Sequence, residues 1–255
     1  MATPLLSLAG VSRRFGGLVA VDDVSADIGE GELVGLIGPN GAGKTTLFNL
    51  ISGVTPVSAG SIRFAGTTIT GLKPFEIARL GVGRTFQNLR IFPNMTVFDN
   101  VSVGALGKRQ IRWYEALAPA GGATRNGITA ATTEALRRVG LDGEADELAA
   151  NLSYGRRKYL EIARALAGAP RLLILDEPAA GLNDHETELL AQFIHDLNAE
   201  GLTVLLVEHD MTLVMKICRR ILVLASGRKI ADGPPAAVQS DTAVLDAYLG
   251  VDDET

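Results

Sequence analysis

The sequence contains a single cysteine, Cys218, so no disulfide can form within the chain. Disulfides are typical of oxidising compartments, and their absence suits a reducing cytosol. No apolar run approaches the roughly 18 residues that cross a bilayer; the longest, Leu172–Leu175 and Val204–Val207, have the length of strands. The first ten residues lack the basic and apolar segments of a secretory signal. We therefore expect neither a transmembrane helix nor an export signal.

An excess of positive charge is also missing. Lys and Arg number 24 against 29 Asp and Glu, a formal net charge of −5. Nucleic-acid-binding surfaces are usually strongly basic, so we expect no nucleic-acid partner, and any contact with a membrane should depend on protein partners. Apolar residues, in contrast, make up 47% of the 255 residues, which is enough for a packed core. This length allows one large α/β domain, or one domain with a small lobe.

Short β-branched and leucine-rich runs alternate with longer helical patterns, which is typical of a sheet built largely from parallel strands. An antiparallel pair, Leu5–Val11 and Val19–Ile28, is expected at the start, separated by the turn-prone Gly16-Gly17. The other expected strands are Leu33–Ile37, Val82–Phe86, Arg171–Leu175, Thr203–Val207 and Arg220–Leu224.

The region between Gln87 and Leu152 is mainly helical in pattern. Thr96, with Asp99 three residues later, predicts a capping box at the start of a helix. The Gly/Ala-rich run 118–127 predicts a loop within this region. We therefore expect an α/β core at about 1–87 and 168–232, interrupted by a helical lobe at about 88–167.

Residues 38–45 carry the strongest signal for chemistry, because they fit the phosphate-loop pattern G-x-x-x-x-G-K-[ST]. Phosphates need converging backbone N–H groups without side chains in the way, and the positive end of the following helix points at the same place. Lys44 is expected to reach the β- and γ-phosphates, and the Thr45 hydroxyl to hold Mg²⁺. The predicted nucleotide contacts here are Gly38, Pro39, Asn40, Gly41, Ala42, Gly43, Lys44, Thr45 and Thr46.

The apolar run Leu172–Leu175 ends in two carboxylates, Asp176 and Glu177. An Asp at a strand tip binds Mg²⁺ in other phosphate-loop enzymes, and Glu177 is then placed to orient or deprotonate the attacking water. Alone, an acidic pair after a buried strand is more often a solvated loop or a helix cap. Together with the phosphate loop it predicts a nucleotide hydrolase.

Three further segments narrow the class. Leu152-Ser153-Tyr154-Gly155-Arg156, about twenty residues before the acidic pair, resembles the signature sequence of the ABC ATPases. His209 stands where that family has its switch histidine, and Gln87 where it has its glutamine loop. Each is weak alone, but the five motifs follow the family's order and spacing. The resemblance covers nearly the whole chain and implies the ABC ATPase fold, a phosphate-loop NTPase core of α/β class with an antiparallel β subdomain and an inserted helical lobe.

The resemblance also implies roles that spacing cannot show. In ABC ATPases two nucleotide-binding domains face each other head to tail, and each ATP lies between the phosphate loop of one and the signature of the other. Ser153 and Gly155, at a helix N-terminus, would thus bind the γ-phosphate held by the opposite subunit. Phe15 stands where the family has an aromatic that stacks on adenine; an ordinary core Phe is the alternative. The implied catalytic residues are Glu177, His209 and Lys44, and the implied Mg²⁺ ligands are Thr45, Gln87 and Asp176.

Within this family, the sequence is similar to the importer ATPases for branched-chain amino acids. The segments that carry this similarity are Gly83–Asn88, Phe92, Met95–Val97, Pro178–Asn183 and Glu208–Met211. Two further segments, Ala231–Pro234 and Asp246–Gly250, resemble the C-terminal extension of that subfamily, which we place at about 233–255. The resemblance implies ATP and ADP as ligands, a second ATPase subunit (identical or not), two membrane permeases and, indirectly, a solute-binding protein. It places the chain peripherally at the cytoplasmic face of the membrane. Importers of urea, amides or other small solutes are the alternative.

Some positions depart from the family's pattern. Tyr154 stands where most members have glycine, and Arg156 replaces the usual glutamine and begins a basic trio with Arg157 and Lys158. Three cations near a helix N-terminus oppose its dipole, so contact with phosphate is one explanation; a solvated face or a partner salt bridge is favoured. Asn183 stands where many members have Asp, which leaves hydrogen bonding but no charge.

Two other classes of protein are alternatives. ABC ATPases that act on DNA or ribosomes usually carry two nucleotide domains, long coiled coils or basic arms, and the sequence shows none of these. A phosphate-loop kinase or GTPase would explain Lys44 and Asp176 but would leave the signature and His209 unexplained.

Overall fold

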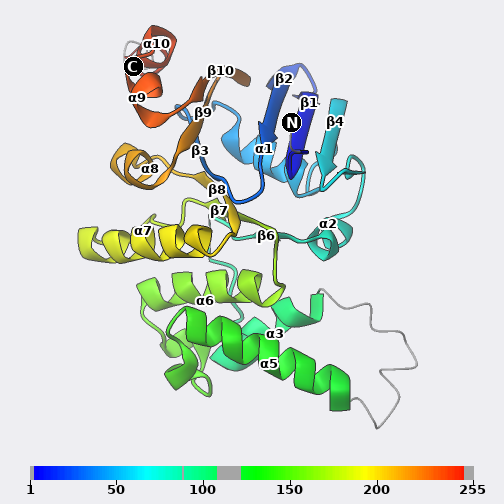
Figure 1. The fold of residues 1–255 in the computed structure, drawn as a ribbon, viewed down its shortest axis with the longest axis vertical. Helices are drawn as coiled ribbons and strands as arrows, with labels where there is room; N and C mark the ends of the chain where they lie inside the picture. The colour runs from blue at the N-terminus through cyan, green and yellow to red at the C-terminus, as the bar shows by residue number, and fades with distance from the viewer. Residues whose placement is uncertain (1–2, 88, 108–121, 250–255) are drawn as a thin grey trace. The chain divides into compact units, whose positions relative to one another are not determined.

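The structure is a computed structural model that describes residues 3–87, 89–107 and 122–249. The chain forms two compact units, one of Met1–Ile77 with Ile174–Thr255 and the other of Ala78–Leu173 (Figure 1). Among the described residues, no helix combines the length and the apolar character needed to cross a bilayer. The segment expected as the helical lobe lies within the second unit.

The first sheet is antiparallel and belongs to the first unit. Its strands are β1 (Leu6–Phe15), β2 (Leu18–Ile28), β4 (Ala59–Phe64) and β5 (Thr67–Thr68), in the order β2-β1-β4-β5. The predicted antiparallel start is confirmed, and both strands extend further toward the Gly16-Gly17 turn than expected. Gly16 takes a positive φ of 57°, which suits a tight turn between paired strands.

The second sheet has the order β10-β9-β3-β8-β7-β6. Its strands are β3 (Leu33–Ile37), β6 (Val82–Arg84), β7 (Leu172–Asp176), β8 (Thr203–Val207), β9 (Arg220–Ala225) and β10 (Arg228–Gly233). β3 runs parallel to both β8 and β9, and every residue of β3, β7 and β8 is buried. Strands covered on both faces show continuous apolar runs rather than alternation, which is why these strands were predictable. β6 ends two residues earlier than expected.

The helices that follow these strands lie in the first unit, except that α2 continues into the second unit at Ala78. They are α1 (Lys44–Ile51), α2 (Pro74–Leu80), α7 (Asp184–Ala199), α8 (Met211–Ile217), α9 (Pro235–Gln239) and α10 (Thr242–Leu249). Asn183 caps α7: its Oδ1 accepts from the Glu186 N–H at 2.9 Å, and the Glu186 carboxylate accepts from the Asn183 N–H at 3.0 Å. This reciprocal box gives Asn183 a hydrogen-bonding role within its own chain.

The second unit is built on three packed helices, α3 (Val97–Gly107), α5 (Gly122–Arg138) and α6 (Tyr154–Ala167), with short 3₁₀ turns at Asp142–Glu144 and Ala149–Asn151. The Thr96 hydroxyl accepts from the Asp99 N–H at 3.0 Å, so one of the two hydrogen bonds of the predicted capping box is confirmed. The predicted loop at 118–127 is wrong where it can be tested, because α5 begins at Gly122; residues 118–121 lie outside the described residues. Extending an existing helix costs little per residue, and α5 is anchored by its buried Ala135 and Leu136.

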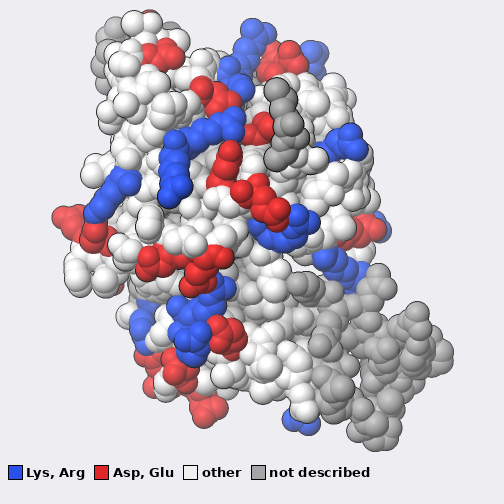
Figure 2. Space-filling view, in the orientation of Figure 1, with Lys and Arg blue, Asp and Glu red and all other residues white. Residues whose placement is uncertain are grey.

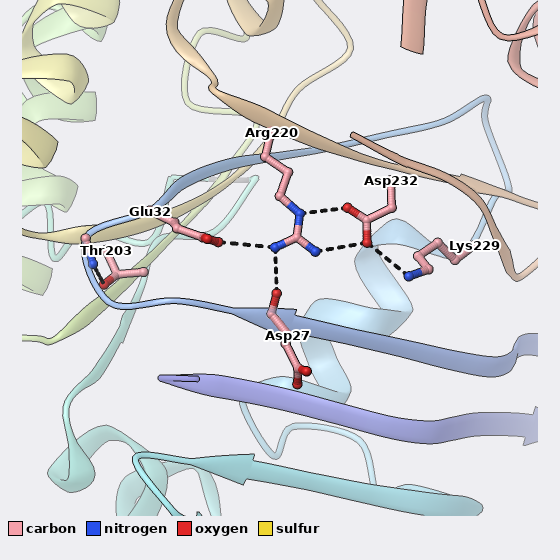
Figure 3. Close-up of polar contacts among 7 residues, drawn as sticks. Asp27, Glu32, Thr203, Arg220, Lys229 and Asp232 are labelled. Atoms are coloured by element: carbon pink, nitrogen blue, oxygen red, sulfur yellow. Dashed lines mark hydrogen bonds and ion pairs between the residues drawn. The ribbon is translucent and has the colours of Figure 1, made fainter. Parts of the chain in front are cut away.

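An arginine joins strands of both sheets in the first unit (Figure 3). The Arg220 guanidinium on β9 donates to both carboxylate oxygens of Asp232 on β10, at 2.7 and 2.9 Å. Its Nη1 donates to the Asp27 carbonyl of β2 at 2.8 Å and to the Glu32 carboxylate at 3.3 Å. Lys229 Nζ adds a bond to Asp232 at 3.0 Å. Opposite charges are interspersed in this way over the face drawn in Figure 2.

Replacement of Asp232 tests this ion cluster. Burial alone raises the pKa of Asp232, but hydrogen bonds from Arg220 and Lys229 lower it below its ordinary 3.8. A carboxyl whose pKa is lower in the folded state stabilises the fold above its unfolded-state pKa, and this contribution is lost as the pH falls through its folded-state pKa. Asp232→Asn should lower the free energy of unfolding by about 1–2 kcal/mol at neutral pH.

Urea unfolding at a series of pH values measures this effect. The difference between the wild type and Asp232→Asn should shrink below about pH 4. Glu188→Gln removes a more exposed ion pair, to Lys216, and is the matched control with a loss of only a few tenths of a kcal/mol. A difference for Asp232→Asn that stays constant from neutral to acidic pH would contradict the ionic explanation.

Candidate nucleotide-binding site

The phosphate loop connects β3 to α1, as predicted, and is packed tightly against neighbouring backbone. Gly38 and Gly43 adopt φ values of 150° and 100°, which side-chain-bearing residues rarely adopt. A Cβ at Gly38 would lie 2.1 Å from the Leu224 carbonyl oxygen, and a Cβ at Gly43 would lie 2.4 Å from that of Ala20. Both glycines are therefore required by the fold of the loop itself.

The turn between β9 and β10 contacts the phosphate loop, and β2 in turn contacts this turn. The Gly227 N–H, in the turn between β9 and β10, donates to the Ala42 carbonyl at 3.0 Å, and the Asp22 N–H donates to the Gly227 carbonyl at 2.8 Å. Arg228 pairs with the Asp22 carboxylate at 2.6 Å. Contacts within the first unit thus support the conformation of the loop.

Lys44 begins α1 and folds back over the loop. Its Nζ donates to the Gly38 carbonyl at 2.6 Å and to the Pro39 carbonyl at 3.0 Å. Burial lowers the pKa of Lys44, and the nearby charges of Glu177 and Asp176 partly offset this effect. The N-cap of α1, Gly43, makes no side-chain cap, and the first turn contains no acidic residue. No side chain of the helix therefore competes with an anion for these N–H groups.

Two carboxylates follow at the end of β7. Asp176 is the buried last residue of this strand. Glu177 has a positive φ of 48°, and its N–H donates to the Val207 carbonyl of β8 at 2.9 Å. A left-handed conformation at a residue other than glycine costs on the order of 1–3 kcal/mol and is common at functional sites. Strain is therefore present at the residue predicted to act on water.

The structure brings the predicted catalytic residues Glu177 and His209 together. The His209 Nδ1 lies 3.9 Å from the Glu177 Oε2 and 3.8 Å from the Glu208 Oε2. The His209 side chain is 64% exposed, whereas the Glu208 side chain is 0% exposed. The sequence prediction used Glu208 only as part of a similarity and missed this contact, although a carboxylate directly after a buried apolar strand was a visible signal.

Tyr248 is a second contact that the sequence did not predict. Its hydroxyl, on α10, lies 4.0 Å from the Met211 Sδ of α8 and hydrogen-bonds the backbone of Gly38. Burial raises the pKa of Tyr248, and the bond from Gly38 partly offsets this effect. The C-terminal helix therefore reaches the first residue of the phosphate loop.

Of the other predicted nucleotide contacts, Ala42 is buried within the loop, whereas Phe15, Thr45, Thr46 and Gln87 are at least partly accessible within their own units. Phe15 is 45% exposed, so the alternative of an ordinary core residue is wrong. The Arg13 guanidinium carbon lies 4.4 Å from the centroid of the Phe15 ring, a cation–π contact. Thr45 is exposed and Thr46 half-buried in α1, and Gln87, in the second unit, is exposed.

The signature residues form the start of α6 in the second unit. Ser153 is its N-cap, with the hydroxyl accepting from the Arg156 N–H at 3.4 Å. Gly155 and Leu152 are buried, whereas Ser153 and Tyr154 are exposed. The predicted helix N-terminus at the signature is confirmed.

The basic trio makes contacts within its own unit, and the expected solvated face is wrong for the buried Lys158, whereas a salt bridge to a partner subunit stays a prediction. Arg156 forms an ion pair with the Glu144 carboxylate of the same unit. Arg157 Nε donates to the Leu152 carbonyl at 2.8 Å. Lys158 is only 3% exposed. The trio is committed to contacts within the second unit, since capping carbonyls and pairing a local acid satisfies its donors.

Comparison with known proteins decides the family. The sequence profile of ABC transporters matches residues 21–180, more than half of the chain. The chain belongs to the ABC transporter family. The prediction of an ABC ATPase, an enzyme coupled to transport, is thereby confirmed, and the kinase and GTPase alternatives are wrong. A second profile, described as branched-chain amino acid ATP-binding cassette transporter, matches residues 228–254.

Individual relatives of this ABC protein match it from end to end. The high-affinity branched-chain amino acid transport ATP-binding protein LivG of Salmonella typhimurium is 43% identical over 253 residues, which cover 98% of this chain and 99% of LivG. BraF of Pseudomonas aeruginosa matches with the same identity and coverage. The structure of MJ1267, an ATP-binding cassette of an ABC transporter in its ADP conformation, aligns with a TM-score of 0.85 and 30% identity, over 98% of this chain and all of that one. The predicted fold is confirmed.

Substitution of Gly38 tests whether loop geometry controls nucleotide binding. In Gly38→Ala the new methyl group must displace the backbone of β9, so ATP affinity should fall more than about tenfold. Gly66→Ala is the control, because Gly66 also has a positive φ, 79°, but nothing lies within 4 Å of its added Cβ. It should cost about 1 kcal/mol of stability and leave affinity unchanged. Titration with a fluorescent ATP analogue and thermal unfolding measure both; equal affinities for the two variants would show that the loop tolerates displacement.

Proposed function

We propose that this chain is the ATP-hydrolysing subunit of an importer for branched-chain or related hydrophobic amino acids. The observation that carries this proposal is the end-to-end 43% identity to LivG and BraF, both described as branched-chain amino acid transport ATP-binding proteins. The match at residues 228–254 supports it independently, because it lies outside the part shared with ABC transporters in general. Selection of the solute belongs to the permeases and the solute-binding protein.

The phosphate loop and Phe15 form the proposed nucleotide site. Backbone N–H groups of residues 38–46 surround the phosphates, Lys44 contacts the β- and γ-phosphates, and Phe15 stacks on adenine. Support comes from the tight backbone of the loop, from the Lys44 Nζ lying against it, and from the exposed Phe15 ring.

The residues near the phosphate loop fit Mg²⁺. Thr45 presents an exposed hydroxyl, and Asp176 is a buried carboxylate whose charge acts on Lys44. Oxygen atoms of this kind are the ligands that Mg²⁺ prefers, and with Gln87 they would hold the ion. When bound, the ion would neutralise charge on the β- and γ-phosphates.

Glu177 and His209 carry the proposed hydrolysis. The Glu177 carboxylate orients the attacking water and accepts its proton, and the His209 imidazole lies beside it with Nδ1 at 3.9 Å. The output is mechanical, because ATP binds the closed pair of ATPase domains more tightly than the open pair. We further propose that Ser153 and Gly155 bind the ATP of the partner subunit, and that the subunit pair attaches to two permeases at the cytoplasmic face of the membrane.

Reconstituted transport tests the proposal as a whole. The chain, its sister ATPase, the permeases and the solute-binding protein encoded beside it are placed in liposomes, and ATP-driven uptake of radiolabelled leucine is measured. We expect uptake with the wild-type chain and a loss of at least about a hundredfold with Glu177→Gln, which keeps shape but loses the base. The variant should still bind Mg·ATP, because Lys44 and the loop are unchanged.

The possible results test the identity of the transported solute separately from the catalytic role of Glu177. Uptake of urea or an amide in place of leucine would retain the transport ATPase and reject the branched-chain assignment. Wild-type turnover by Glu177→Gln would remove Glu177 from catalysis.

The composite site has its own test, because Lys44 and Ser153 should serve different ATP molecules. Lys44→Ala removes a phosphate contact within the same subunit and should weaken ATP binding by the monomer. Ser153→Ala leaves the phosphate loop intact, so monomeric binding should stay within about twofold of the wild type. It should weaken ATP-dependent dimerisation about tenfold to a hundredfold, since hydrogen bonds to charged groups contribute roughly 1.5–3 kcal/mol.

Calorimetry on the monomer and size-exclusion chromatography with ATP measure these two quantities. If Ser153→Ala abolishes monomeric binding as completely as Lys44→Ala, then Ser153 belongs to its own subunit's site and the head-to-tail arrangement is wrong.

A further inference from the structure

Glu208 is the most deeply buried carboxylate beside the proposed catalytic residues. It follows β8 directly, and its side chain is 0% exposed. Its Oε1 accepts from the Ala179 N–H at 2.8 Å, and its Oε2 accepts from the His209 N–H at 3.3 Å. The two oxygens therefore bind two different loops, the one that follows β7 and the one that follows β8.

Burial of this carboxylate is costly. Burial raises the pKa of Glu208, the Ala179 N–H and the neighbouring His209 partly offset that effect, and the charge of Glu177 adds to it. An apolar residue of similar volume would fill the same position without a desolvation cost. Packing alone therefore does not explain a glutamate here.

The two loops that Glu208 joins carry the catalytic pair. Ala179 lies two residues after Glu177 in the same loop, and the other tie is to the backbone of His209 itself. The His209 Nδ1 lies near both carboxylates, 3.8 Å from the Glu208 Oε2 and 3.9 Å from the Glu177 Oε2. One carboxylate is buried and hydrogen-bonded, and the other is the proposed base.

We propose that Glu208 is a positioning residue for ATP hydrolysis, which sets the separation of Glu177 and His209 by tying the Ala179 N–H and the His209 N–H to one buried carboxylate. It acts through the two loops to which it is hydrogen-bonded. The inference rests on the proposed function, because hydrolysis is the reaction that the pair performs.

Two variants separate the hydrogen bonds from the bulk of the side chain. Glu208→Gln keeps the length and one carbonyl oxygen, which can still accept from Ala179, and loses the second acceptor. Glu208→Ala loses both bonds. We expect kcat for ATP hydrolysis to fall about 3- to 10-fold in the first and about 30- to 100-fold in the second, since a displaced catalytic group lowers the rate steeply. KM for ATP should stay within about twofold in both, because no described contact joins Glu208 to the phosphate loop or to Lys44.

A double variant tests whether the effect passes through His209. If Glu208 positions His209, the loss in Glu208→Gln/His209→Ala should be smaller than the product of the two single losses. Glu32→Gln is the control, since Glu32 is a carboxylate of the same unit that pairs with Arg220, and it should leave kcat and KM unchanged.

The possible results of these experiments distinguish a positioning role of Glu208 from a purely structural one. A lower kcat with unchanged KM, a wild-type thermal midpoint for Glu208→Gln and a non-multiplicative double variant support the proposal. Wild-type kcat in both single variants overturns it, as does a rise in KM with unchanged kcat, or a parallel loss of stability and affinity, which would mark a purely structural tie. An inactive wild-type chain in the presence of its partners would instead count against the proposed function.

Discussion

Parallel strands end at a common edge of their sheet, and the chemistry of this chain depends on that constraint. β3 and β8 are paired in parallel with Leu36 opposite Val207, so the phosphate loop and the Glu208-His209 pair follow at the same edge. The hydrogen bond from the Glu177 N–H to the Val207 carbonyl brings the end of β7 there as well. Residues from three distant parts of the sequence meet because backbone hydrogen bonding aligns their strands.

Charged side chains at this edge of the sheet are stabilised by hydrogen bonds and by nearby groups of opposite charge. Lys44 is half-buried near the charges of Asp176 and Glu177, and its ammonium is held by carbonyl oxygens. Glu208 is satisfied by backbone N–H groups, and the exposed imidazole of His209 lies against it. In the second unit, Arg157 caps a carbonyl and Arg156 pairs with an acid, so their donors are also used locally. A site that already meets its own hydrogen-bonding needs is preorganised for a ligand that replaces only a few of those bonds.

The sequence predicted the structural features that depend on residues close together along the chain. Buried strands of five residues appear as apolar runs, the glycine loop follows from the steric needs of phosphate, and the caps at Thr96 and Ser153 were visible as side-chain oxygens before helices. The segment at 122–127 was misjudged because α5 is anchored further along by Ala135 and Leu136, and extending an existing helix costs little per residue.

The missed contacts join residues far apart along the chain. Glu208 binds Ala179, and Tyr248 reaches Gly38. Neither contact leaves a periodic or spaced pattern in the sequence, because each depends on which strands become neighbours. The contacts of the basic trio within its own unit were missed for a related reason, since a run of charges does not reveal which of them finds an acid or a carbonyl after folding.

The position of β3 has a consequence for the order in which the molecule can be assembled. Its partners on either side, β8 and β9, come from much later in the chain. β9 also supplies the Leu224 carbonyl that lies against Gly38, and the Tyr248 hydroxyl near Gly38 comes later still. A ribosome releases the glycine loop early, long before the backbone against which it packs exists. The loop thus cannot reach its final conformation until β8, β9 and α10 have been synthesised, so a nascent chain that lacks them should be unable to capture nucleotide. Long-range closure of this kind slows folding, and it makes ATP binding depend on these later segments.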